Sequence, residues 1–68
     1  MISERIKTNA TAITATLEEE GMMPVLELRD HTNLEEKDIL LALGYLCGKE
    51  QVQLFSQQEN DLNVMLVF

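Results

Sequence analysis

The sequence predicts an α+β domain in which a three-helix core precedes a C-terminal β-hairpin. Three observations lead to this expectation. Residues 34–47 combine a charged first turn with apolar residues that recur on one side of a helix. A Gly-Met-Met-Pro stretch separates two further helical segments that precede it, and after Gly48 the hydrophobic period changes from 3.6 residues to 2.

Chain length and composition limit what this domain can be. The 68 residues form one domain, 1–68, near the lower size limit at which a single core holds itself together. Ordering such a chain costs on the order of 100 kcal/mol at roughly 1.5 kcal/mol per residue, so apolar burial has to be efficient or supplemented by a partner chain. A hydrophobic content of 46% suits a globular domain, and a homodimer is a natural expectation.

Cysteine content and charge indicate the environment of the protein. The one cysteine excludes an internal disulfide and favours the reducing cytoplasm. The first residues do not resemble a signal peptide, and no apolar stretch is long enough to span a membrane. The net charge is −7, from 12 acidic and 5 scattered basic residues. This balance disfavours non-specific attraction to nucleic acid or to anionic membranes.

The first helix is expected over residues 3–20, with Ser3 as its N-cap and Gly21 as its stop. Threonines occupy much of its remaining surface and are weak helix formers, so tertiary packing has to supply stability. The apolar residues that form a narrow inward seam are Ile6, Ala10, Ile13 and Leu17.

A short second helix follows a very short extended segment at residues 22–23. Pro24 suits the first turn of this helix, because its missing N–H would have no intrahelical partner there. The helix is expected to end at Asp30 or His31, before a turn at residues 31–33. Its inward residues are Val25 and Leu28, with Leu26 as a further candidate.

The third helix is expected to begin near Leu34 or Glu35 and to extend to Cys47. Two caps are open: Asn33 followed by Glu36 resembles a capping box, and Glu35 is a poorer alternative. The predicted inner face consists of Ile39, Ala42, Leu43, Leu46 and Cys47. The opposite face consists of Lys37, Asp38, Leu41, Gly44 and Tyr45.

A glycine inside this helix has a cost. Gly44 destabilises a helix by about 1 kcal/mol relative to alanine, which favours the close approach of another element at that position.

Two β-type runs, residues 52–55 and 63–68, are separated by the polar stretch 56–61 and are expected to pair as a hairpin. The last strand is apolar on both sides and is expected to be buried on both faces. One side carries Val64, Leu66 and Phe68, and the other carries Met65 and Val67.

This order of elements is that of the winged helix-turn-helix fold. Residues 42–46, Ala-Leu-Gly-Tyr-Leu, followed by Gly48, Lys49 and Val52, resemble the A-L-G-W-L-x-R-E-x-K-I segment of a small family of stand-alone bacterial winged helix-turn-helix domains. Tyr45 stands where that family has tryptophan. The resemblance implies a three-helix core with a β-wing and a role in transcription regulation, and it implies no catalytic site.

Binding to DNA through the third helix, about residues 35–47, and the wing is one candidate function. The positions that would contact DNA are Glu36, Lys37 and Leu41, which lie in a mainly acidic segment. DNA affinity commonly needs about 6–10 phosphate contacts, and five scattered basic residues could scarcely supply them. The wing tip, residues 57–61, has no lysine or arginine to reach a minor groove.

The competing candidate is a protein-interaction module. The core does not require the apolar residues Leu41, Tyr45, Met65 and Val67, so these are the predicted contact residues. They favour an isologous homodimer through the terminal strand, the first helix or both, together with an unidentified protein partner. The alternative is that the first helix covers the last strand within one chain.

No residue set in the sequence predicts catalysis, a metal or a cofactor. Cys47 is expected to be a small buried core residue, and His31 a capping or surface residue. The chain offers no nucleophile and base pair, so we expect a domain that is not an enzyme.

Overall fold

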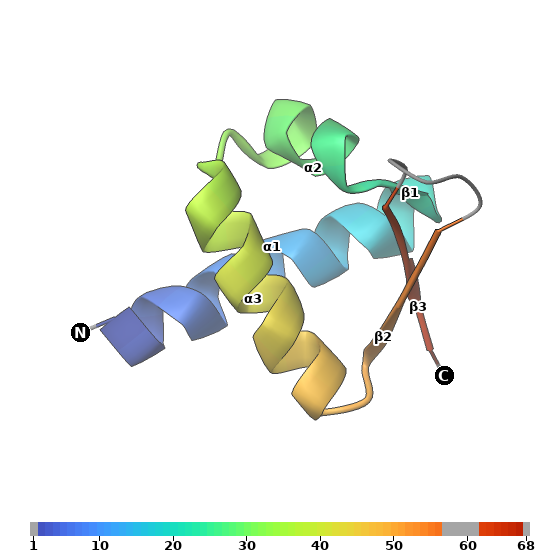
Figure 1. Cartoon of the computed structure of the whole chain (residues 1–68). Coiled ribbons are helices and arrows are strands. Elements are labelled where there is room, and N and C mark those ends of the chain that lie inside the picture. The colour runs from blue at the N-terminus through green and yellow to red at the C-terminus, as the bar shows by residue number, and fades with distance from the viewer. Residues whose placement is uncertain (1, 57–61, 68) are drawn as a thin grey trace.

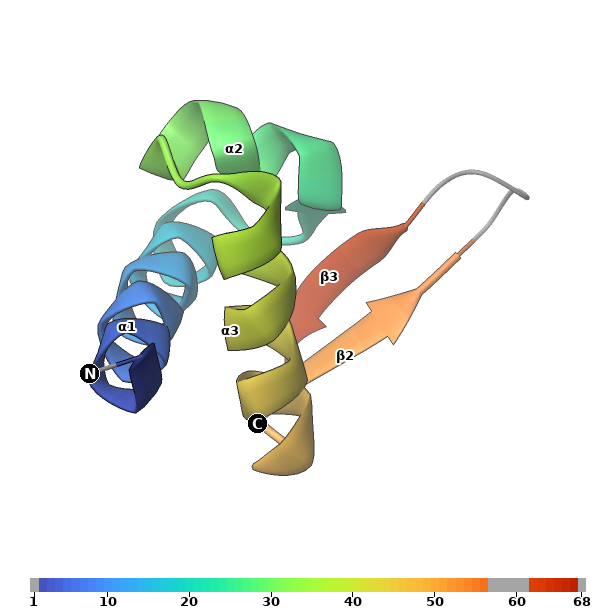
Figure 2. The ribbon, with the colours of Figure 1, turned by 60° about the vertical axis from the view of Figure 1, so that its left-hand side comes forward.

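The computed structural model describes residues 2–56 and 62–67 and contains the predicted elements in the predicted order (Figure 1). Helix α1 packs mainly against α3, and Figure 2 shows the strands β2 and β3 extending away from the helices. The chain is therefore an α+β domain with three helices and a small antiparallel sheet. The elements are α1 (Ile2–Glu20), β1 (Met23–Pro24), α2 (Val25–Thr32), α3 (Glu36–Gly48), β2 (Val52–Phe55) and β3 (Asn63–Leu66).

A single core joins the three helices to the sheet. In α1, three residues of the predicted seam are buried and Ile6 is half-buried. In α3, four residues of the predicted inner face are buried, whereas Cys47 is half-buried and packs against the core. The largest fully buried side chains are Ile13, Leu28, Ile39, Leu43, Leu46 and Val64.

The helices begin at residues other than those predicted. Helix α1 begins at Ile2, so Ser3 lies inside its first turn and is not the N-cap. Pro24 precedes α2 as its cap residue, with an extended ψ of 145°, because it also belongs to strand β1. Of the two caps left open for α3, the structure has Glu35, whose side chain makes no capping hydrogen bond to the described residues, and the capping box of Asn33 and Glu36 is wrong.

The helix ends explain why the turn between α2 and α3 lies at residues 33–35 rather than at the predicted residues 31–33. Asn33 adopts a left-handed conformation, φ 59°, and its N–H donates to the carbonyl of Arg29 at 2.8 Å. Such a residue closes the C-terminus of one helix and cannot serve as the N-cap of the next one. Helix α2 therefore continues through His31 and Thr32. Gly21, φ 84°, ends α1 in the same way, as predicted.

Three predictions about the burial or packing of individual residues are wrong. Leu26 is 70% exposed, because the short helix α2 turns only Val25 and Leu28 into the core. Asp38 is buried rather than outward, since it accepts a hydrogen bond from Arg5 at 2.8 Å. A Cβ atom on Gly44 would meet no described atom within 4 Å, so no other element approaches closely there.

The sheet has the strand order β1-β3-β2, with both pairings antiparallel. Strand β3 is central: Val64 lies opposite Leu54 of β2 and opposite Met23 of β1. The hairpin confirms the sequence prediction, whereas the pairing of β1 with β3 was not predicted. It fastens the segment between α1 and α2 to the end of the chain.

The last strand is shorter than predicted and is not buried on both faces. It ends at Leu66, and Phe68 lies outside the described residues, as does the predicted wing tip at 57–61. Met65 and Val67 are 37% and 41% exposed. The alternative in which α1 covers this side of the strand within one chain is therefore wrong.

Candidate interaction surfaces

The four predicted contact residues lie on two different elements. Leu41 and Tyr45 are one turn apart on α3, and Met65 and Val67 lie in and just after β3. Leu41, Met65 and Val67 are exposed, whereas Tyr45 is half-buried and turns toward α1. The structure thus provides separate apolar positions on α3 and on the sheet.

The outer face of α3 is formed by Lys37, Leu40, Leu41, Gly44 and Gly48, all of which are exposed. Leu40 and Leu41 are 48% and 40% exposed, so two neighbouring apolar side chains lie on this face. Leu40 falls between the two faces of a helical projection and was therefore not among the predicted contact residues. This face offers apolar area and one positive charge.

Acidic side chains surround the start of α3. Glu36 and Lys37, two of the positions considered for DNA contact, are exposed in the first turn of the helix. The turn between α2 and α3 lines a hollow of about 400 Å³, and its charged residues are Arg29, Asp30, Glu35 and Glu36. One base among three acids makes this region unfavourable for a phosphate backbone.

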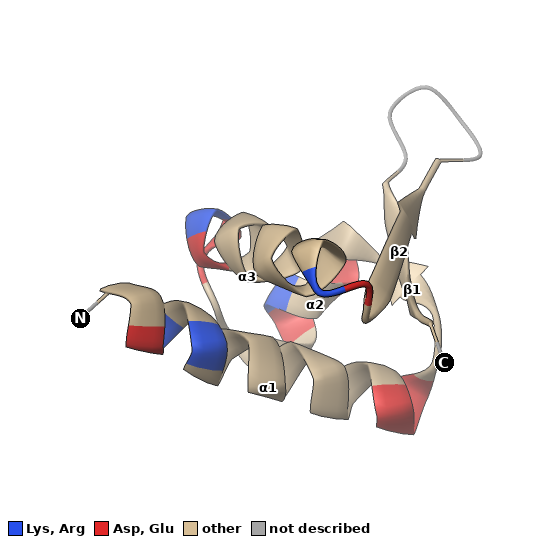
Figure 3. Cartoon of the chain, turned by 90° about the horizontal axis from the view of Figure 1, so that it is seen from below, with Lys and Arg blue, Asp and Glu red and all other residues tan. Residues whose placement is uncertain are grey.

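The five basic residues do not form one continuous patch, as Figure 3 shows for the helices, although Lys7 and Lys49 line the same groove. Arg5 is bound to Asp38, and Lys49 lies 3.3 Å from the Tyr45 hydroxyl and 5.2 Å above its ring. The other three basic residues lie on three different helices: Lys7 on α1, Arg29 on α2 and Lys37 on α3.

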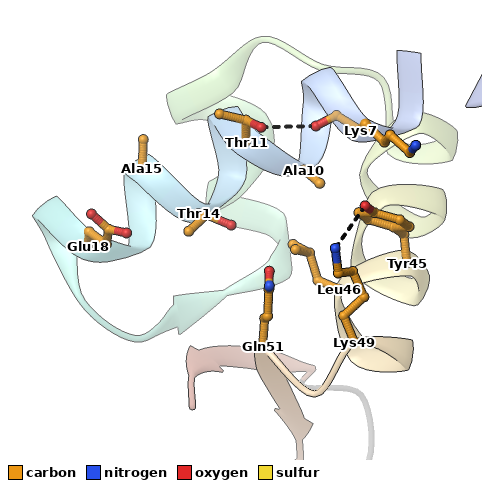
Figure 4. A pocket seen from close by; sticks show the side chains of 10 residues that line it. All are labelled: Lys7, Ala10, Thr11, Thr14, Ala15, Glu18, Tyr45, Leu46, Lys49 and Gln51. Atoms are coloured by element: carbon orange, nitrogen blue, oxygen red, sulfur yellow. Dashed lines mark hydrogen bonds between the residues drawn. The ribbon is translucent and has the colours of Figure 1, made fainter. Parts of the chain in front are cut away.

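A groove of about 440 Å³ runs between α1 and the C-terminal end of α3 (Figure 4). Its floor includes the buried residues Ala10 and Leu46, and Tyr45 and Lys49 line the side opposite α1. The α1 side is lined by Lys7, Ala10, Thr11, Thr14, Ala15 and Glu18. Sequence reasoning did not single out this set, because its members are small or charged and carry no apolar period.

The structure also locates the residues that were assigned structural roles. Cys47 is a free cysteine that packs against the core, and His31 is exposed at the end of α2. Among the described residues, no group of His, Cys, Asp and Glu side chains could hold a metal ion. No helix in the described part of the chain has the length and apolar character needed to cross a membrane.

Comparison with protein families identifies a family whose members share this architecture. The model of one family, described as winged helix-turn-helix domain (DUF2582), matches residues 1–66. The chain belongs to this family. Winged helix-turn-helix domains are typically non-enzymatic modules of DNA binding or regulation. Neither the curated proteins nor the solved structures gave a significant match to this winged helix domain.

Proposed function

We propose that this winged helix domain acts through contacts with proteins, including a second copy of itself, and catalyses no reaction. The observation that carries the proposal is the outer face of α3. In DNA-binding winged helix domains the third helix enters the major groove. Here that helix exposes Leu40 and Leu41, and its first turn is acidic. A protein surface can cover such a face favourably, whereas a phosphate backbone cannot.

The free energy gained by covering exposed apolar side chains supports a function in protein contacts. Covering a leucine that is already half exposed removes on the order of 1 kcal/mol of unfavourable hydration. Met65 and Val67 add a second exposed apolar position on the sheet. A protein of this size gains more from covering these side chains than from placing acids beside DNA phosphates. We also propose that the domain is cytoplasmic. Its single cysteine cannot form an internal disulfide, and small domains without disulfides are typical of the reducing cytoplasm.

Sedimentation equilibrium of the full chain at micromolar concentration tests self-association. The expected result is an average mass above the 7.7 kDa of the single chain. This average mass should rise with protein concentration as more dimer forms. A single 7.7 kDa species over the whole range would remove self-association from the proposal.

A DNA-binding regulator is the second candidate, and membership of the winged helix family favours it. It would use Glu36, Lys37 and Leu41 of α3 together with the wing. A duplex of random sequence, titrated into isotope-labelled protein at about 50 mM salt and again at higher salt, separates the two functions by amide NMR shifts. We expect no shifts in α3. Shifts confined to α3 that fade steeply with salt would instead establish DNA binding.

A further inference from the structure

We propose that the outer face of α3 binds a basic amphipathic helix of a different protein. An apolar side chain of that helix inserts between Leu40 and Leu41, above Gly44, and its lysines or arginines lie beside the acidic start of α3. The inference rests on the protein contacts proposed above for this face, and it adds the shape and the charge of the partner.

The exposed residues of α3 have the arrangement of a hole in helix packing. When two helices pack closely, a side chain of one commonly inserts between four residues of the other, which follow the spacing i, i+3, i+4 and i+7. Lys37, Leu40, Leu41 and Gly44 have this spacing, and all four are exposed. An apolar side chain that enters the hole contacts both leucines. This spacing suits a helical partner.

Gly44 leaves space at the base of this hole. A glycine in the middle of a helix costs about 1 kcal/mol relative to alanine. No described atom lies within 4 Å of the position that a Cβ atom would take, so packing inside the domain does not require glycine here. At 100° per residue, Gly44 projects between Leu40 and Leu41, one turn further along the helix. The backbone of α3 is therefore open to close approach from outside.

The charges beside the hole favour a basic partner. Glu36 is exposed one turn before Leu40, and it also lines the hollow between α2 and α3 together with Asp30 and Glu35. Arg29 is the one basic residue among the described residues that line this hollow. Lysines or arginines of a bound helix would meet these carboxylates. The net charge of −7 attracts a basic partner over a longer range as well.

Two synthetic peptides of about 18 residues test the shape and the charge of the partner. Both have leucines at helical spacing and alanines between them, and their polar positions are all lysine in one peptide and all glutamate in the other. Each is titrated into the isotope-labelled full chain at about 50 mM salt and followed by amide NMR shifts. We expect the lysine peptide to bind at least about tenfold more tightly, with shifts centred on residues 36–44.

Three variants of α3 test the residues that carry the inference. Glu36→Lys should weaken binding of the lysine peptide about fivefold, and Lys37→Glu should strengthen it by a similar factor. Gly44→Ala should weaken binding about tenfold although it stabilises the helix, because its methyl group fills the hole. Glu19→Lys is the matched control: it makes the same charge change as Glu36→Lys at an exposed residue near the end of α1, and binding should stay within about twofold.

The outcomes separate this inference from the proposed function. If the glutamate peptide binds α3 as tightly as the lysine peptide, the face still contacts proteins, but the basic partner is wrong. If Gly44→Ala leaves binding unchanged, no side chain enters the hole. If neither peptide shifts the amides of α3, the protein contacts proposed for its outer face fail together with this inference.

Discussion

At the scale of single residues, the left-handed positions at the helix ends differ in how well their side chains suit them. Gly21 and Asn33 are residue types that tolerate a positive φ. Glu50, φ 59°, is not. Its N–H donates to the Cys47 carbonyl and the N–H of Gln51 donates to the Leu46 carbonyl, both at 3.0 Å, which is the Schellman pattern. Glutamate therefore stands where the motif prefers glycine.

Glu50→Gly is expected to raise the free energy of unfolding by about 1 kcal/mol, because it removes the Cβ strain of the left-handed conformation. Urea denaturation followed by circular dichroism measures the change. Gln51→Gly, at the next position, should lower stability or leave it unchanged. A loss of stability for Glu50→Gly would show that the side chain contributes more than its backbone strain costs.

Gly44 is a second position at which a different residue is expected to make the fold more stable. It lies in the middle of α3, and an added Cβ would meet no described atom within 4 Å. We expect Gly44→Ala to stabilise the domain by about 1 kcal/mol, equivalent to a rise in Tm of about 4–8 °C. Thermal unfolding gives the result. Gly48→Ala, at the last residue of the helix, should give a smaller gain, and equal gains would contradict this explanation.

At the scale of elements, α1 and α3 are joined by a polar contact as well as by the core. Arg5 and Asp38 form an ion pair whose side chains are 59% and 10% exposed. Asp38 also lies in the first turn of α3, where the helix dipole favours an acid. The pair thus fixes the start of α1 beside the start of α3, at some distance from the groove at the other end of α3.

A double-mutant cycle of Arg5→Ala and Asp38→Ala is expected to give a coupling of about 0.5–1 kcal/mol, since one partner is mostly exposed. The coupling is calculated from four unfolding free energies, which are those of the natural chain, the two single variants and the double variant. The coupling should decrease at 1 M salt. A coupling near zero would mean that the contact positions the helices without stabilising them.

At the scale of the whole molecule, a chain of 68 residues can bury only a small hydrophobic core. Association with a second chain would bury additional apolar surface. The buried residues form one cluster, and eight large hydrophobic side chains of the described residues are exposed. A dimer that forms only from folded chains stabilises the fold by mass action. The self-association proposed above would therefore make the stability of the fold depend on protein concentration.

This linkage predicts that Tm rises with protein concentration. Calorimetric scans from about 10 μM to about 1 mM should show an upward shift for the natural chain, because the folded state is favoured by association. No shift over this range of concentration would contradict self-association.

The candidate surfaces were partly accessible from the sequence. Leu41, Met65 and Val67 were predicted as exposed contact residues because apolar side chains on both sides of an element are not all needed by one core. Tyr45 was placed on the same outer face but turns toward α1. The groove was not predicted, since its lining depends on how α1 and α3 pack, and packing brings residues 7–18 and 45–51 together.

What the sequence determined by itself is local: the three helices, the hairpin, the inward seam of α1 and the stop at Gly21, because periodicity and backbone preference act over a few residues. Tertiary structure decided what depends on distant partners. Only packing shows that β1 pairs with β3, that Asp38 is buried against Arg5 and that Leu26 is exposed. A side chain is buried only where another element covers it, and neighbouring residues alone do not specify that element.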